Sequence, residues 1–322
     1  MVAKNILMYF PWSRPLEEAA PLGGLNNRFG ALFELRRLQW PKFEDFADAE
    51  RFNQGIAGFF DNVLLQNYFL FREDMRVRSG NVVRIVERCT SDGKVTLLDG
   101  EVLDGIDILI IVSFDSQRTE QRPSGSELKA LRNFVNDPSR TLFVCPHHDI
   151  GSADGVPDNE VMAAQEAEFH HHGDRGIPGQ QRLGGFAKSL LRDLGIPVSN
   201  QFGLRPAKLP DGSAAPIKVS NQADRFNLLQ GVRTFHLHPH LPHLQMLGDS
   251  PQKLDVLAEQ SIDPAAPPHP FFKERNTFDA LLQSKPNVFG GRLLICDATI
   301  WTSTNGGLGG LRQFWVNITR LG

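Results

Sequence analysis

Residues 106–112, with the sequence IDILIIV, constrain the fold most because they form a run dominated by β-branched apolar residues. Such a run is typical of a strand buried on both faces of a parallel sheet. Ser124 and Glu127 have the spacing of a capping box and predict a helix that ends before Pro138. Another short apolar strand is expected at residues 141–145. Strand, helix and strand at this spacing predict a right-handed βαβ unit and hence the α/β class, with a mostly parallel sheet.

Other segments extend this pattern. Helices are expected at residues 185–194 and after the glycine-rich turn at residues 306–310. Further strands are expected in three segments: residues 4–10, residues 81–98 (as a pair of strands) and residues 292–296.

The length of 322 residues favours a single α/β domain, residues 1–322, with inserted segments. The insertions are expected near residues 15–75, 150–182 and 245–286, where glycine, proline and polar residues are frequent. Within the last of them, a short helix is expected at residues 278–282.

Composition excludes several classes of function. The net charge of -3 gives no general basic excess for binding a nucleic-acid backbone. The sequence contains no run of about 18 apolar residues, so no membrane-spanning helix is expected. The apolar segment at the start is too short for a signal peptide. The 3 cysteines contain no C-x-x-C pair, which fits a reducing cytoplasm. We therefore expect a cytoplasmic protein whose partner is a small-molecule substrate. The sequence does not decide whether the chain forms a homo-oligomer.

Polar side chains follow four of the expected strands. Because parallel strands end at the same edge of a sheet, these side chains should meet in one site. Polar residues also follow strands simply because loops are polar. The candidate residues are Trp12 and Arg14; Asp115 and Arg118; His147, His148 and Asp149; and Asp297, Thr299 and Trp301.

Each residue type suggests a role. His147 or His148 would act as a general base or metal ligand, and Asp115 or Asp149 would orient the histidine or complete a metal site. The guanidinium groups of Arg14 and Arg118 would hold an anionic group of the substrate. Further substrate contacts are expected from Trp12, Asp297 and Trp301.

Histidines alternate at His236, His238 and His240, so an extended chain would place them on one face. Three such imidazoles could bind a divalent metal ion, most plausibly zinc, completed by Asp149 or Asp297. The alternative is a loop that merely happens to be rich in histidine. The separate run at residues 170–172 is expected to be a solvated loop.

Cys145 lies where a strand-to-helix elbow would carry a nucleophile. The next residue, Pro146, has no backbone N–H to donate to an oxyanion, so a buried thiol is the preferred interpretation. No nucleotide cofactor is expected, because the glycine-rich residues 306–310 lack the remaining features of a phosphate-binding loop.

Four segments of the chain resemble the class I glutamine-amidotransferase-like superfamily, especially its trehalose-utilisation-type branch. These segments are LDGIDILIIVSFDS, ELKALRNFV, TLFVCPHHDIG and GRLLICDATIWTS…GLRQFWVNI. The resemblance implies a flavodoxin-like, three-layer α/β sandwich. Cys145 matches the family's elbow cysteine, but Pro146 replaces the glycine-containing surroundings. The resemblance implies a His-Pro-Glu element at residues 297–299, where this chain has Asp-Ala-Thr. A working glutaminase triad is therefore not expected.

Three hypotheses about function follow. The favoured one is a hydrolase for a small polar molecule, such as an amide, another C–N bond or a sugar derivative. The others are a cysteine hydrolase that uses Cys145 and a non-catalytic ligand-binding or assembly module. The first is favoured because imidazole and charged groups are concentrated at the expected strand ends.

Overall fold

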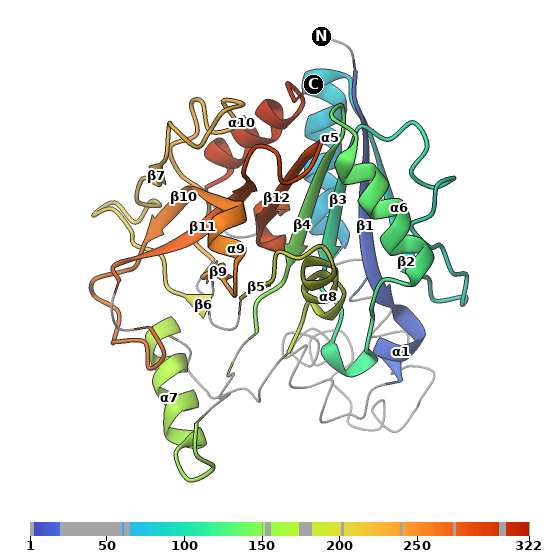
Figure 1. Cartoon of the computed structure of the whole chain (residues 1–322). Coiled ribbons are helices and arrows are strands. Elements are labelled where there is room, and N and C mark those ends of the chain that lie inside the picture. Colours follow the sequence, from blue (N-terminus) through green and yellow to red (C-terminus); the bar gives the residue numbers. More distant parts are fainter. Residues whose placement is uncertain are drawn as a thin grey trace, which may run out of the picture.

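An eight-stranded sheet forms the centre of the computed structural model (Figure 1). The structure describes residues 3–19, 60, 65–149, 151, 156–173, 182–200, 203–238, 241–272, 275–302 and 307–321. In spatial order the strands are β2 (Val82–Cys89), β1 (Asn5–Ser13), β3 (Ile108–Ser113), β4 (Thr141–Pro146), β12 (Arg292–Cys296), β11 (Thr277–Ser284), β10 (Leu254–Ser261) and β7 (Lys218–Val219).

Neighbours among the first five strands are parallel, and the remaining three strands pair antiparallel. This is a mixed α/β fold with a large, mostly parallel sheet. The registers align β1, β3, β4 and β12 closely, with Ile108 opposite both Ile6 and Thr141. The carboxyl ends of these four strands therefore follow one another along one edge of the sheet.

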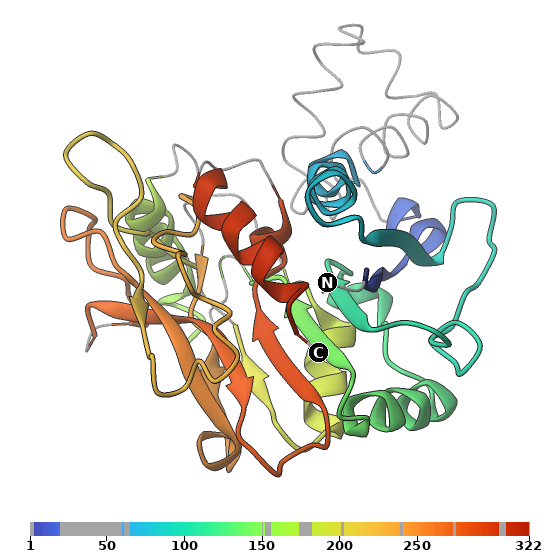
Figure 2. The same ribbon diagram turned by 90° about the horizontal axis from the view of Figure 1, so that it is seen from above.

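Helices cover both faces of the parallel strands (Figure 2). On one face, α5 (Leu65–Ser79) and α10 (Leu308–Ile318) pack over a core that includes Ile110 and Phe143. On the other, α6 (Gly125–Asn136) and α8 (Gly185–Asp193) pack over alternate residues of the same strands. Burial of both faces explains why β3, β4 and β12 are mainly apolar, whereas β2 at the edge of the sheet carries Arg84, Glu87 and Arg88.

The remaining elements are short, apart from one helix of 12 residues. They are α1 (Arg14–Glu18), α7 (Val161–His172), α9 (Ser250–Lys253), β5 (Val198–Ser199), β6 (Gly203–Leu204), β8 (Leu241–Pro242), β9 (Gln245–Met246) and the 3-10 turns at Gln117–Thr119 and Ala298–Trp301. Among the described residues, no helix combines the length and apolar character needed to cross a bilayer.

The central βαβ prediction is confirmed. Strand β3, helix α6 and strand β4 follow one another as expected. The capping box is present: Glu127 N–H donates to Ser124 Oγ over 3.3 Å, and Ser124 N–H donates to Glu127 Oε2 over 2.8 Å. The expected helix at residues 185–194 is α8, the strand at residues 292–296 is β12, and the terminal helix is α10.

Several predictions need correction. Residues 278–282 belong to strand β11 rather than a helix, and β10 and β11 extend the central sheet within the expected insertion at residues 245–286. Helix α7 lies within the loop expected at residues 150–182. Strand β2 pairs in parallel with β1, and the expected hairpin is reduced to an isolated bridge between Cys89 and Val95. Most of the expected insertion at residues 15–75 lies outside the described residues.

Candidate functional site

Asp297 lies at the centre of a hydrogen-bonded group where β12 ends. Its Oδ1 accepts from Thr299 N–H over 2.9 Å and from the Thr299 hydroxyl. The same hydroxyl oxygen lies 3.0 Å from His236 Nε2. Because the hydroxyl proton goes to Asp297, the imidazole donates to the hydroxyl. A chain of hydrogen bonds thus links His236 to Asp297 through Thr299.

The backbone fixes the proton of His236 on the same nitrogen. His238 N–H donates to His236 Nδ1 over 3.2 Å, which leaves Nε2 as the protonated nitrogen. Burial lowers the pKa of His236 to about 4, partly offset by the negative charge of Asp297. His236 is therefore neutral near pH 7, in the tautomer that the chain of hydrogen bonds requires.

His148 faces the other oxygen of the same carboxylate. Its Nδ1 lies 3.6 Å from Asp297 Oδ2, and its side chain is fully buried. The ring stacks on His147 at a centroid distance of 4.3 Å and meets the His238 ring edge-on at 5.6 Å. The end of β4 and the end of β12 therefore bring together residues separated by about half the chain, as the parallel-sheet argument predicts.

His147 occupies the next position along this edge. Its Nδ1 is 3.0 Å from the carbonyl oxygen of His148, so that nitrogen donates. Its ring contacts Phe114 at a centroid distance of 4.2 Å. His147 thus supports the His148 ring.

Asp115 and Asp149 point toward α8 and not toward Asp297. Asp115 accepts from Ser113 Oγ over 2.5 Å and from Phe186 N–H over 3.0 Å, at the start of α8. Asp149 accepts from Leu183 N–H and lies 2.9 Å from Lys188 Nζ. Burial raises the pKa of Asp149, against the opposing effect of Lys188. Both carboxylates thus hold the start of α8 against the sheet, and their predicted role in orienting a histidine stays a prediction.

The two predicted arginines are engaged in structural ion pairs. Arg14 is buried and forms a bidentate pair with Glu87 on β2, and Trp12 Nε1 donates to the same carboxylate over 2.7 Å. Arg118 Nη2 lies 3.9 Å from Glu17 Oε2 and donates to the carbonyl oxygen of Leu16 in α1 over 3.2 Å. The Arg14 contacts tie β1 to β2 and the Arg118 contacts tie the turn at Gln117–Thr119 to α1, while the predicted contact with an anionic substrate stays a prediction.

Cys145 lies beneath the group formed by His148, Asp297, Thr299 and His236. Its Sγ accepts from Trp301 Nε1 over 3.1 Å and lies 3.5 Å from Cys296 Sγ. All three side chains are fully buried. Trp301 therefore covers the thiol and belongs to the core, an arrangement expected of a structural cysteine and not of an exposed nucleophile.

The predicted three-histidine metal site is only partly described. His240 lies outside the described residues. Both ring nitrogens of His236 take part in hydrogen bonds, and its ring centroid is 6.2 Å from that of His238. The run at residues 170–172 is helical instead of a solvated loop: His171 and His172 are buried at the end of α7, near Glu168 and His269.

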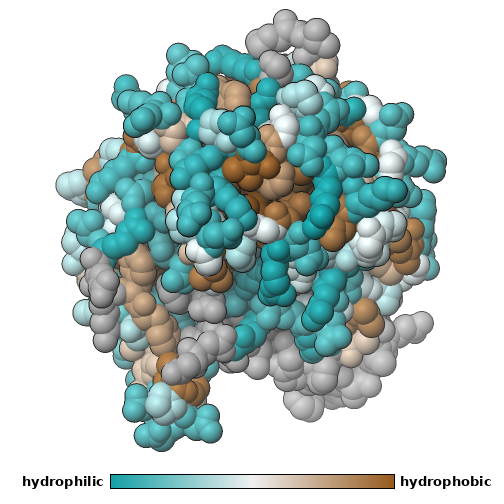
Figure 3. All heavy atoms as spheres, in the orientation of Figure 1, coloured by the Kyte–Doolittle hydropathy of each residue, from teal (hydrophilic) through white to brown (hydrophobic). Residues whose placement is uncertain are grey.

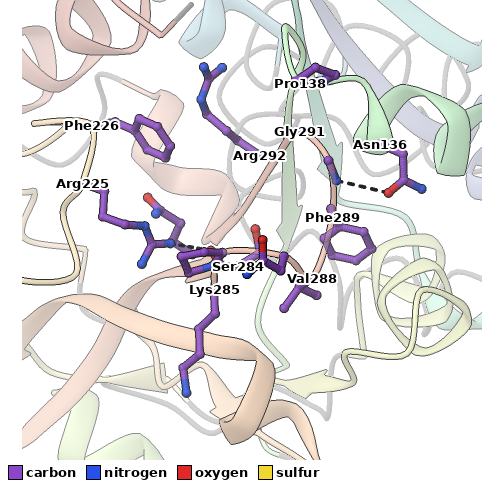
Figure 4. A pocket seen from close by; sticks show the side chains of 14 residues that line it. Asn136, Pro138, Arg225, Phe226, Ser284, Lys285, Val288, Phe289, Gly291 and Arg292 are labelled. Carbon is purple, nitrogen blue, oxygen red and sulfur yellow. Dashed lines mark hydrogen bonds between the residues drawn. The ribbon is translucent and has the colours of Figure 1, made fainter.

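One small cavity touches Asp297 within the part of the chain that the structure describes. The cavity lined by His236, Asp297 and Gln260 has a volume of about 10 Å³, barely enough for one water molecule. A much larger cavity of about 740 Å³ lies at the opposite edge of the sheet, where β12 begins. There the guanidinium of Arg292 lies 4.8 Å from the Phe226 ring centroid, and Arg225 donates to the Ser284 carbonyl oxygen (Figure 4). Figure 3 shows apolar surface gathered in a hollow on this side, near the turn between β11 and β12.

Comparisons with known proteins add little. No family model and no curated protein matches the chain. Among solved structures, it is similar to the exo-β-1,4-mannosidase Op5Man5 from Opitutaceae bacterium strain TAV5, with 12% sequence identity and a TM-score of 0.31. The alignment covers 93% of this chain and 32% of that one, so the chain spans about a third of the mannosidase. A similarity this low identifies neither fold family nor activity.

Proposed function

We propose that the chain is a hydrolase acting on a small polar molecule, with His148 as general base and Asp297 as the carboxylate that orients it. The observation that carries the proposal is the position of Asp297 between two histidines from different segments. A carboxylate that fixes the ring of a histidine is a recurring arrangement for activating water or a hydroxyl. The substrate class is an amide, another C–N bond or a sugar derivative.

Thr299 and His236 complete the arrangement. Their hydrogen bonds bring no positive charge to Asp297, because both His236 and the Thr299 hydroxyl, which accepts from His236 and donates to Asp297, are uncharged. They hold one carboxylate oxygen in place, which leaves Asp297 Oδ2 directed at His148. The negative charge then stabilises the imidazolium that His148 becomes when it accepts a proton.

We further propose a flavodoxin-like sandwich related to the amidotransferase-like superfamily. The order β2-β1-β3-β4-β12 of the parallel strands supports this, since it matches the flavodoxin order when β12 is counted as the fifth strand. The antiparallel strands β11, β10 and β7 are an addition to that pattern. Trp301 covers Cys145. This supports the view that the chain shares the fold of the superfamily but not its glutaminase reaction.

A second candidate function is a non-catalytic ligand-binding or assembly module. The full burial of His148 and the small cavity beside Asp297 favour it, because a general base needs contact with its substrate. In that case the hydrogen bonds around Asp297 serve to fix the loops at the end of the sheet.

The test is a hydrolysis screen with chromogenic glycosides, anilides and small amides, applied to the wild type and to H148Q, D297N and C145A. We expect kcat to fall about 100-fold or more in H148Q and D297N, the usual range for losing a general base. C145A should stay within a few-fold of the wild type. Full activity in H148Q and D297N would refute the proposal, and loss in C145A alone would favour the cysteine hydrolase. Ligand-induced thermal stabilisation without turnover would favour the binding module.

A further inference from the structure

A separate cluster of ligand-type side chains lies at helix α7, which projects at the lower left of Figure 1. Glu168 and His172 are one helical turn apart on α7, so they share a face, and His269 comes from the segment between β10 and β11. Their exposed fractions are 0%, 3% and 2%. One potential ligand atom from each residue lies within 4.8 Å of the other two.

The backbone sets the tautomer of His172. Its Nε2 is 2.6 Å from the carbonyl oxygen of Gly203, which can only accept, so Nε2 carries the proton. In the neutral ring, Nδ1 is then the nitrogen without a proton. Metal-binding histidines characteristically donate their other ring N–H to a carbonyl or carboxylate in this way.

His171 has a different role because both its nitrogens are used by the backbone. Nδ1 donates to the carbonyl oxygen of Pro267 over 2.7 Å, and Nε2 accepts from Arg205 N–H over 2.9 Å. These bonds tie the segment that carries His269 to the end of α7. His171 thus positions the cluster without belonging to the set of ligands.

The charges of the cluster suit a divalent cation. Glu168 is a carboxylate without exposure to solvent, and its Oε1 lies 3.8 Å from His269 Nε2. A carboxylate and two imidazoles together offer oxygen and nitrogen ligands of the kind that divalent transition-metal ions take.

We propose that Glu168, His172 Nδ1 and His269 Nε2 bind a divalent transition-metal ion, with Zn²⁺ as the preferred ion. Two imidazoles and a carboxylate are a known zinc ligand set that leaves a further coordination position for water or a ligand. Binding through Nε2 of His269 places its ring proton on Nδ1, so the Phe271 N–H, now 3.2 Å away, must turn aside. The site shares no residue with the proposed hydrolase.

The experiment measures metal binding by the full chain and needs no substrate. Wild type, H172A, H269A and E168Q are purified without added metal, analysed for bound elements, stripped with a chelator and titrated with Zn²⁺ against a chromophoric competitor. H170A is the matched control, because His170 is exposed on the same helix. Anaerobic titration with Fe²⁺ tests the alternative ion for two imidazoles and a carboxylate.

We expect about one Zn²⁺ per chain in the wild type and in H170A, and binding weakened about 100-fold or more in the three variants. E168Q keeps the shape of the side chain and remains informative if an alanine variant fails to fold. Chelation should lower the melting temperature of the wild type and of H148Q, but not that of H172A. The proposal is overturned if the wild type binds no Zn²⁺ at micromolar concentration or if H172A and E168Q bind as tightly as H170A. Tighter binding of Fe²⁺ would overturn the choice of zinc.

Discussion

Single residues at the end of the sheet show which part of the candidate site could be predicted. His148 and Asp297 follow from a general rule, because parallel strands deliver what comes after them to one edge. The link through Thr299 to His236 does not follow from any local pattern, because the two residues are 63 positions apart. Asp115 fitted the same rule, yet it is turned toward the N–H groups at the start of α8, which no strand pattern reveals.

The buried imidazole of His236 predicts how stability depends on pH. Its pKa is about 4 in the folded chain and 6.5 when unfolded, so between these values only the unfolded chain binds the proton. The stabilisation of the folded chain that depends on neutral His236 is present above pH 6.5 and is lost as the pH falls toward 4. In full it amounts to roughly 3 kcal/mol. H236N should therefore lose less stability than the wild type over this range, as measured by urea unfolding at a series of pH values.

The control for this prediction is H170N, which replaces an exposed histidine. Its stability should follow the wild-type dependence on pH. Asparagine at position 236 can still accept the His238 N–H that His236 Nδ1 accepts. Equal slopes for H236N and the wild type would show that His236 does not remain neutral when the chain folds.

Elements differ in how visible they are in the sequence. The sequence predicts strand β12 at its observed bounds because the four residues after Arg292 are apolar and buried. Helix α7 was missed because its buried face contains Glu168, His171 and His172, so no apolar stripe marks it. Strands β10 and β11 were missed because polar residues such as Glu259 and Asp279 lie within them, where both pair with Arg275.

Glu127 of helix α6 makes contacts beyond those of the capping box. Besides capping Ser124, Glu127 is fully buried and accepts from Arg88 of β2 over 2.7 Å and from Leu98 N–H over 3.2 Å. E127A leaves Arg88 without this partner and should reduce the free energy of unfolding by about 3–5 kcal/mol. S124A removes only the cap and should cost about 1 kcal/mol.

Chemical denaturation of both variants, with the exposed K129A as control, checks this order. E127Q should fall between S124A and E127A, because the amide oxygen can still accept while the charge is lost. A loss in E127A no greater than that in S124A would mean that the ion pair with Arg88 contributes little to the attachment of α6 to β2.

At the scale of the whole molecule, α10 connects the core to the candidate site. Its residues Leu311, Phe314, Trp315 and Ile318 form a buried stripe at helical spacing. Asn317 Nδ2 donates to the carbonyl oxygens of Leu228 and Gln230, each over 2.8 Å. The segment that begins there continues to His236, so α10 supports the backbone that delivers this histidine to Asp297.

Substitutions at two neighbouring glycines of α10 distinguish the effect of close packing from that of helix propensity. A Cβ at Gly310 would lie 1.8 Å from the Thr234 carbonyl oxygen, whereas a Cβ at Gly309 would meet nothing within 4 Å. G310A should therefore push the helix away from the segment leading to His236 and destabilise the fold by about 1–3 kcal/mol. G309A should stabilise it by up to about 1 kcal/mol, because alanine favours the helix. Thermal unfolding measures the opposite signs, and the NMR signals of the His236 ring should move in G310A alone. If both variants had the same effect, α10 would not hold this segment by direct backbone contact.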